Sequence, residues 1–253
     1  MSAPAIDASG VTKRFPRGRG AVTVLEGLDL VLSPGELVAV TGPSLSGKTV
    51  LVDLLAGWAR PDAGAIVWAG GSTVPPAWSD LTVIPQAFAL LEELTVEENM
   101  VLARRLVRRR ARRVARRVAR GDGRRVARRV AGGDARRVDR RIARRRGPGD
   151  DGDDGLDDLV GPLGLSRLRA RRAMELAVGE RQRVMVARAL VDHPPVVLAD
   201  EPVAHQDWHH ARVVVDLLRR AVDDGAACLV ATRQPDVAEQ ADRCVELAPT
   251  LDM

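Results

Sequence analysis

Cysteine, aromatic side chains and long hydrophobic runs are all scarce in this chain of 253 residues. Its two cysteines, Cys228 and Cys244, make neither a disulfide framework nor a metal-binding motif, and both are expected to pack as small core side chains. The longest apolar stretches are six or seven residues, far short of the ~20 that a membrane-spanning helix requires. The first ten residues lack an apolar central run, which predicts that no secretory leader is present. We therefore expect a cytosolic protein that reaches a membrane only through a partner.

Lysine is rare as well, and positive charge is concentrated in one segment. Residues 101–146 contain 21 arginines and three aspartates, a net charge of +18, whereas the other 18 basic and 31 acidic residues leave −13. The overall charge of +5 is therefore no argument for binding nucleic acid. The segment contains twelve-residue units at 112–123, 124–135 and 136–147, in which alanine and valine follow a helical spacing that glycines interrupt. We expect short, fluctuating helices there, followed by a flexible acidic tract at 147–158.

Three roles are open for this arginine-rich insertion at about 101–155. The first is that of a solvated surface loop, which is tolerated because the entropy of loop closure grows slowly with length. The second is adsorption to an anionic membrane surface, which attracts basic residues by about 1 kcal/mol each. The third is contact with nucleic acid phosphates, although the segment has no Trp, Tyr or Phe on which bases could stack.

Short apolar runs alternate with helical patterns over the rest of the chain. The runs at 36–42, 194–202 and 227–232 show no polar alternation, as expected for strands buried on both faces. Apolar residues at helical spacing follow the first run, and another helical pattern covers 211–222. This order predicts an α/β fold with a mostly parallel sheet covered on both faces.

A phosphate-binding loop follows the first of these runs. Residues 42–49 fit the pattern G-x-x-x-x-G-K-[ST], with a predicted strand before and a predicted helix after. Backbone N–H groups of such a loop point at phosphate oxygens, and the helix dipole favours negative charge there. Lys48 would reach the β and γ phosphates, and the Thr49 hydroxyl would bind Mg²⁺. The expected nucleotide-binding residues of this loop are Gly42, Pro43, Ser44, Leu45, Ser46, Gly47, Lys48 and Thr49.

Two adjacent acids end the apolar run at 194–202. Asp200 and Glu201 stand at the carboxyl end of a predicted buried strand, where doubly wound sheets bind ligands. Asp200 is expected to hold the hydration shell of Mg²⁺, and Glu201 to orient or deprotonate the water that attacks the γ-phosphate. The pattern therefore predicts ATP and Mg²⁺ as ligands, with Glu201 as the catalytic residue.

With these motifs in place, the chain resembles the ATP-binding subunit of an ABC transporter, over nearly all of its length except the arginine-rich insertion. Its N-terminal half resembles the branch that serves lipoprotein release and macrolide-type export. The resemblance implies a P-loop NTPase core with a mostly parallel sheet, an antiparallel β subdomain and an inserted helical subdomain. It implies one ATP-binding domain over 1–253, in which 1–86 and 187–253 form the nucleotide-binding core and 87–186 the helical subdomain.

The resemblance also implies roles for residues outside the two motifs. Phe15 matches an aromatic that stacks on adenine, and Asp207 matches the acid of a loop after the catalytic glutamate. Gln86 matches a glutamine that contacts Mg²⁺ and water. The implied metal ligands are Thr49, Gln86 and Asp200. The stretch 175–191 matches the signature motif and its helix, which contact ATP held by the opposite subunit. The signature residues in this chain are Ala177, Val178, Gly179 and Glu180.

The chain departs from the family pattern at three places. Leu45 replaces a glycine, so a side chain must fit beside the phosphates at φ > 0 with attendant strain. The signature, usually Leu-Ser-Gly-Gly-Gln, reads Leu-Ala-Val-Gly-Glu at 176–180, and Ala177 has no hydroxyl for the γ-phosphate. Arg233 replaces a histidine near the γ-phosphate and the catalytic acid, where it could pair with phosphate as a cation. Because losing one transition-state donor typically costs ~10²–10³ in rate, we hypothesise that a homodimer binds Mg·ATP but hydrolyses it poorly. A heterodimer with an intact partner would divide the defects between two sites.

The resemblance implies two partners, a second ATP-binding subunit and a separate membrane permease. The protein would then be cytoplasmic and peripheral on the inner face of the cell membrane. Two alternatives stay open: an ABC-type ATPase that acts on nucleic acid or ribosomes without a permease, and a catalytically silent regulatory subunit.

Overall fold

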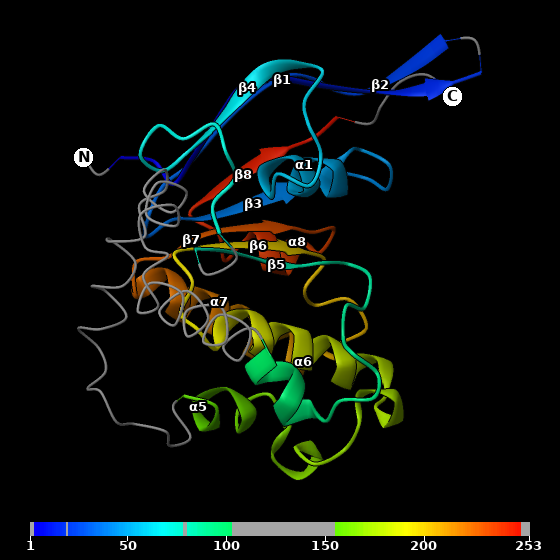
Figure 1. Cartoon of the computed structure of the whole chain (residues 1–253), viewed down its shortest axis with the longest axis vertical. Helices are drawn as coiled ribbons and strands as arrows, with labels where there is room; N and C mark the ends of the chain where they lie inside the picture. The colour runs from blue at the N-terminus through cyan, green and yellow to red at the C-terminus, as the bar shows by residue number, and fades with distance from the viewer. Residues whose placement is uncertain (1–2, 19, 78–79, 103–154, 249–253) are drawn as a thin grey trace, which may run out of the picture.

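The computed structural model describes residues 3–18, 20–77, 80–102 and 155–248, which form two β-sheets and a set of helices (Figure 1). The short helices predicted for the arginine-rich units lie outside the described residues, as does most of the acidic tract.

A five-stranded parallel sheet forms the centre of the fold. Its strand order is β5-β6-β7-β3-β8, and each neighbouring pair is parallel. The strands are β3 (Leu37–Thr41), β5 (Leu81–Ile84), β6 (Val196–Asp200), β7 (Ala227–Ala231) and β8 (Arg243–Glu246). The three apolar runs predicted as buried strands form β3, β6 and β7, the three inner strands, so the predicted α/β fold is confirmed.

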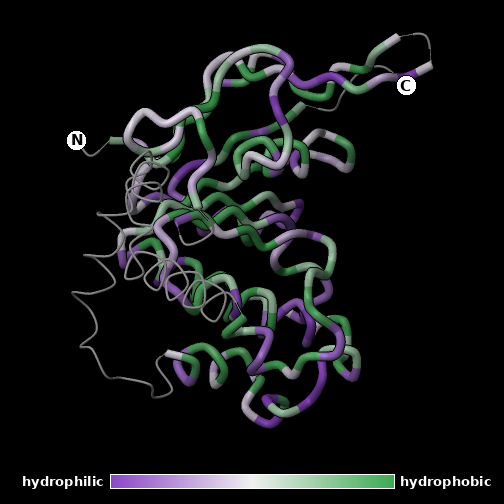
Figure 2. The backbone as a smooth tube through the Cα atoms, in the orientation of Figure 1, coloured by the Kyte–Doolittle hydropathy of each residue, from purple (hydrophilic) through white to green (hydrophobic). Residues whose placement is uncertain are grey.

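Alternate residues of the central strands pack into two different cores because successive side chains of a strand point to opposite faces. In β7, Cys228 and Val230 belong to one core, and Ala227 and Leu229 belong to the other. Figure 2 shows the inner strands as mainly hydrophobic segments of the backbone. This double burial explains why the sequence shows apolar runs rather than polar alternation.

The two cysteines lie in different surroundings. Cys228 is fully buried in β7, and desolvation raises the pKa of its thiol to about 12, so it packs as expected. Cys244 is exposed on β8, with its Sγ 3.4 Å from the Thr41 hydroxyl. The expectation of a core position is therefore wrong for Cys244, because β8 is an edge strand of the sheet that the described residues form.

The antiparallel β subdomain covers one face of the parallel sheet. It has the order β2-β1-β4, and its strands are β1 (Ile6–Arg17), β2 (Gly20–Leu32) and β4 (Ala63–Trp68). Their apolar residues share one core with α1 (Lys48–Leu55). The indole Nε1 of Trp68 donates to the backbone oxygen of Leu55 at 3.0 Å, which ties the end of β4 to α1.

Helices cover the other face, as the fold prediction requires. The longest helices that the structure describes in full are α6 (Val178–Leu190) and α7 (Trp208–Asp223). They pack with residues 96–101 in a second core, on the face opposite to α1. Shorter helices are α5 (Asp157–Val160), η2 (Ser166–Leu168), η3 (Ala173–Glu175) and α8 (Pro235–Ala238). The bounds 87–186 of the helical subdomain stay a prediction.

The end of the predicted acidic tract is helical rather than flexible. Its last two residues, Asp157 and Asp158, begin α5. Leu156, Leu159 and Val160 of the same short segment are 5%, 9% and 1% exposed in the second core. Burial of these three side chains therefore overrides the polar composition around them.

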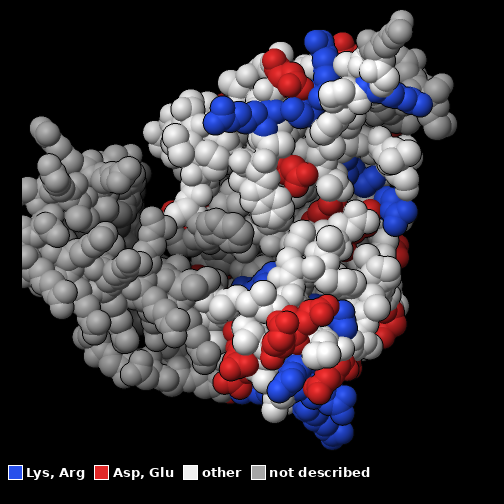
Figure 3. Space-filling view, turned by 45° about the vertical axis from the view of Figure 1, so that its right-hand side comes forward, with Lys and Arg blue, Asp and Glu red and all other residues white. Residues whose placement is uncertain are grey.

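The surface of the described residues carries both signs of charge. On the side shown in Figure 3, basic and acidic side chains are interspersed. Among the described residues, no helix is both long and apolar enough to cross a membrane.

Candidate nucleotide-binding site

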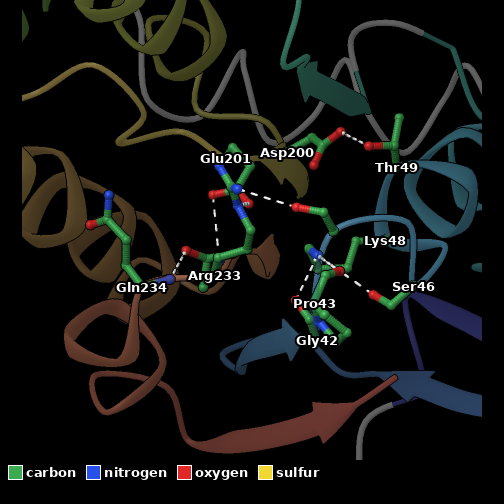
Figure 4. Close-up of polar contacts among 11 residues, drawn as sticks. Gly42, Pro43, Ser46, Lys48, Thr49, Asp200, Glu201, Arg233 and Gln234 are labelled. Atoms are coloured by element: carbon green, nitrogen blue, oxygen red, sulfur yellow. Dashed lines mark hydrogen bonds and ion pairs between the residues drawn. The ribbon is translucent and has the colours of Figure 1, made fainter. Parts of the chain in front are cut away.

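Three segments that are distant in the sequence meet at one edge of the parallel sheet. Because β3, β7 and β6 are neighbours, their carboxyl ends bring together residues 42–49, 200–201 and 232–234 (Figure 4). The loop and the acid pair that the sequence singled out therefore face each other.

The loop 42–49 needs glycine at both ends. Gly42 has φ 145°, and a Cβ there would lie 2.6 Å from the carbonyl oxygen of Leu247. Gly47 has φ 91° and is the N-cap of α1. Between them, Leu45 has φ 68° and is 85% exposed, so its side chain extends into solvent. The expected positive φ is present at Leu45, and in an L-residue it costs about 1–2 kcal/mol.

Lys48 is held by the loop that precedes it. Its Nζ donates to the carbonyl oxygens of Gly42 and Pro43, each at 2.8 Å, and lies 3.5 Å from the Ser46 hydroxyl. The residue is only 7% exposed, and Ser46 is 1% exposed. These contacts place the ammonium group inside the curve of the loop (Figure 4).

Thr49 joins the loop to the acid pair. Its hydroxyl donates to Oδ2 of Asp200 at 2.6 Å, across a sequence separation of 151 residues. Asp200 is 2% exposed, and burial raises its pKa above the ordinary value, with further upward contributions from the charges of Glu201 and Asp53. The Thr49 hydrogen bond and the Lys48 charge act in the opposite direction. Within the described structure, the buried Oδ1 of Asp200 has no hydrogen-bond partner.

A cavity of about 490 Å³ opens beside Asp200. Its lining residues are Thr49, Val52, Asp53, Trp58, Val83, Pro85, Gln86, Ala87 and Asp200. The three predicted metal ligands, Thr49, Gln86 and Asp200, thus share one cavity. Asp53 is a residue that the sequence interpretation missed, although it stands four residues after Thr49 on the same face of α1.

Glu201 is paired with Arg233. The Nε of Arg233 donates to Oε1 of Glu201 at 3.0 Å, and its backbone N–H donates to Oε2 at 3.4 Å. The guanidinium also reaches the phosphate-binding loop, where Nη1 donates to the Ser44 hydroxyl at 3.3 Å. Glu201 has φ 49°, and its side chain is 6% exposed against 56% for Arg233. Arg233 thus lies beside Glu201, whose catalytic role stays a prediction.

The signature residues do not line this cavity. Their helix α6 packs in the core on one face of the sheet, and α1 packs in the core on the other. Ala177 is the N-cap of α6 and offers no side-chain acceptor, while Oε2 of Glu180 accepts the Ala177 N–H at 2.8 Å. The carbonyl oxygen of Gly179 accepts from Nε2 of Gln206 at 2.9 Å, which ties the start of α6 to the segment after Glu201.

The side chain of Phe15 lies on β1, outside the cavity. It is 42% exposed, and Nζ of Lys13 is 5.5 Å from its ring centroid. Its stacking on adenine stays a prediction.

A parallel sheet with a phosphate-binding loop after β3 and an acid pair after β6 defines a P-loop NTPase. The model of the ABC transporter family matches residues 25–204, and the chain belongs to this family.

Curated relatives agree with the branch that the sequence suggested. The lipoprotein-releasing system ATP-binding protein LolD 1 of Rhodospirillum rubrum is 32% identical over 98% of this chain and 96% of its own. LolD of Pseudomonas syringae pv. tomato is 31% identical over 93% of this chain and 91% of its own. The macrolide export ATP-binding/permease protein MacB of Rhodopseudomonas palustris is 30% identical over 98% of this chain but only 33% of its own. The predicted likeness to this branch is confirmed.

Solved structures share the fold. A dimeric bacterial ABC transporter cassette superimposes with a TM-score of 0.73 at 22% identity, covering 97% of this chain and 95% of its own. A dimeric post-hydrolysis cassette bound to ADP and Pi gives 0.72 at 22% identity, covering 96% and 94%.

Proposed function

We propose that this chain is the ATP-binding subunit of an ABC transporter and powers a separate membrane permease. The ATP-binding part of this proposal is carried by the 2.6 Å contact between the Thr49 hydroxyl and Asp200, next to the Lys48 ammonium inside its loop, and the permease is proposed from the likeness to ATP-binding proteins named for transport. A cationic, N–H-rich loop next to oxygen ligands suits a polyphosphate together with its divalent cation.

The loop 42–49 would bind the phosphates. Lys48 exchanges the carbonyl oxygens of Gly42 and Pro43 for phosphate oxygens, which are stronger acceptors because they are charged. The N-terminal N–H groups of α1 add the positive end of a helix dipole. Phe15 would contribute contact to the adenine ring.

Thr49 and Asp200 fit a magnesium ion. They present hard oxygen ligands, and the buried Oδ1 of Asp200, unpartnered within the described structure, is one that a cation would satisfy. Gln86 faces the same cavity. In the described residues no cluster of three or more His, Cys, Asp or Glu could hold a metal, and Mg²⁺ characteristically needs only one or two carboxylates besides phosphate oxygens. When bound, Mg²⁺ would offset the charge of the phosphates.

Glu201 would accept the proton of the attacking water. Its side chain is nearly buried and lies one residue beyond Asp200, within reach of the loop through Arg233 and Ser44. Hydrolysis is expected to be weak in a homodimer, because Ala177 cannot donate a hydrogen bond across the interface and one such donor is worth ~10²–10³ in rate.

Two partners follow from this proposal. The similar solved cassettes are dimeric, which supports a second ATP-binding subunit. LolD 1 of Rhodospirillum rubrum is named as the ATP-binding protein of a lipoprotein-releasing system, and MacB is named as an ATP-binding/permease protein, so the second partner would be a membrane permease, with this chain at the inner face of the membrane. We do not propose nucleic acid as a partner, because the arginine-rich insertion lies outside the described residues and these relatives are named for transport.

Titration of the purified chain with a fluorescent ATP analogue tests this function. Wild type is expected to bind, and Lys48→Ala is expected to weaken binding at least about a hundredfold, because a charged donor inside the loop is lost. Gln240→Ala, an exposed change after α8, is the matched control. Equal affinity of wild type and Lys48→Ala would contradict the proposal.

Turnover is measured on the same samples, with Glu201→Gln as the inactive reference. A low wild-type rate that depends on Glu201 supports weak hydrolysis. A high rate in the isolated chain would show that the altered signature does no harm.

A further inference from the structure

Both carboxylate oxygens of Glu201 accept hydrogen bonds from Arg233. The guanidinium of Arg233 takes Oε1 at 3.0 Å, and the backbone N–H of the same residue points at Oε2 at 3.4 Å. A general base needs an oxygen that is accessible to the proton it accepts. In this arrangement Arg233 occupies one acceptor site on each oxygen and competes with water for the carboxylate.

The position of Arg233 is fixed by the turn that carries it. Thr232 before it is fully buried, and its hydroxyl accepts the backbone N–H of Gln234 at 3.0 Å. Pro235 then begins α8. The backbone N–H of Glu201 in turn donates to the Ala231 oxygen at 2.8 Å, so the two segments are held side by side. The backbone that carries Arg233 is therefore fixed beside Glu201, although the Arg233 side chain itself is 56% exposed.

The second contact of the guanidinium links this pair to the nucleotide site. Nη1 of Arg233 donates to the Ser44 hydroxyl, within the loop that would bind the phosphates (Figure 4). An incoming phosphate would compete for the same guanidinium, because arginine pairs with phosphate as readily as with carboxylate.

We infer that Arg233 is a positioning residue that locks Glu201 and restrains ATP hydrolysis, because in the ATP-bound chain its guanidinium divides between Glu201 and the phosphate. The inference rests on the proposed function and adds the regulation of that site. Water attacks the γ-phosphorus as the bond to the ADP oxygen breaks, one water proton passes to Glu201, and ADP and inorganic phosphate leave. Arg233 takes no part in bond formation, and it sets how often Glu201 is available.

The test compares kcat and KM for ATP in Arg233→Ala, Arg233→Lys and wild type. Arg233→Ala is expected to raise kcat about threefold to tenfold by freeing Glu201, and to raise KM because a cation beside the loop is lost. Arg233→Lys keeps the charge but cannot reach Glu201 and Ser44 together, so its kcat should be intermediate. Gln234→Ala is the matched control, since this exposed neighbour points away from Glu201 in Figure 4.

The double variant Arg233→Ala/Glu201→Gln shows whether the gain in kcat comes from releasing Glu201 or from a general structural change. The gain in kcat must disappear in it, since a lock has nothing to release once Glu201 is gone. Unchanged or lower kcat in Arg233→Ala, with circular dichroism and melting temperature as in wild type, overturns the lock. ATP binding measured in parallel separates the two proposals, because a chain that binds ATP without this gain refutes only the lock. A chain that binds no ATP refutes the proposed function and the lock together.

Discussion

The two halves of the proposed ATP site are built in different ways. The half formed by the phosphate-binding loop and Asp200 is buried and hydrogen-bonded within the chain, with Ser46, Lys48 and Asp200 only 1%, 7% and 2% exposed. The signature half lies at the start of α6, where Val178 is 47% exposed. The first half stabilises the fold of its own chain, whereas the second is open to a partner.

Three residues that depart from the family pattern have exposed side chains. Leu45 and Val178 are 85% and 47% exposed, and the Arg233 side chain is 56% exposed. Within the buried half, the residue that departs from the family pattern is Leu45, and its side chain extends into solvent. Apart from the left-handed backbone of Leu45, these substitutions therefore cost the fold little, and their effect is expected on the chemistry and on the contact with a partner.

The largest expected effect, a rise in the ATPase rate, comes from restoring the signature residues of the exposed half. Ala177→Ser with Val178→Gly supplies the missing hydroxyl and removes bulk, and turnover should rise about tenfold to a hundredfold if α6 completes the site of a second copy. Stability should hardly change, because a serine N-cap gains about 1 kcal/mol and a helical glycine loses about as much. Steady-state ATPase assays measure this, and an unchanged rate would mean that α6 does not act at the site.

Neutralising Asp200 tests how much the buried half of the site costs the stability of the fold. Because burial raises the pKa of this carboxyl, its ionised form destabilises the folded chain, and this cost grows as the pH rises through the folded pKa. Asp200→Asn should therefore raise the free energy of unfolding near neutral pH by about 1 kcal/mol, while magnesium-dependent ATP binding falls. Urea unfolding tests it against Asp216→Asn, an exposed control on α7 that should shift stability by less than about 0.5 kcal/mol. A less stable Asp200→Asn chain would contradict the argument.

Leu45→Gly tests the exposed residue within the buried half. It relieves a left-handed backbone at φ 68° and loses little packing, so stability should rise by up to about 1 kcal/mol. Thermal unfolding measures the change. A loss of stability would show that the exposed leucine makes contacts that outweigh the relief.

The smallest effect is expected at an ion pair distant from both halves. Arg219 holds Asp242 with two contacts of 2.7 Å, and this hydrogen bonding lowers the pKa of Asp242 from 3.8 to about 2. The pair therefore contributes fully above about pH 4, and its contribution is lost as the pH falls toward 2. Because both side chains are partly exposed, Asp242→Asn should cost no more than about 1 kcal/mol near neutral pH. Urea unfolding at pH 7 and pH 2.5 should show the gap between variant and wild type narrowing in acid.

Much of the site could be predicted because its signals are local. The spacing of Gly42, Gly47 and Lys48 specifies a loop between a strand and a helix, and an apolar run ending in Asp200 specifies a strand end. Both predictions depend on a few neighbouring residues, so the sequence was enough.

Contacts between distant segments were not predictable in the same way. Nothing near Gln206 indicates that its amide holds Gly179. Asp53 stands one turn after Thr49, but its interaction with Asp200 depends on how α1 packs beside β6. The helical end of the acidic tract was missed because Leu156, Leu159 and Val160 are recognisable as core residues only once their partners are in place.

The amino-acid order alone determined the three inner strands, the loop 42–49 and the acid pair, because each is set by short-range spacing and hydrophobicity, and the motifs together carried the resemblance to the family. Only the tertiary structure decided that the guanidinium of Arg233 lies on Glu201 and Ser44, since that contact joins the ends of β6, β7 and β3. The physical reason is that strand order in a parallel sheet, which no local pattern encodes, decides which distant side chains come within hydrogen-bonding distance.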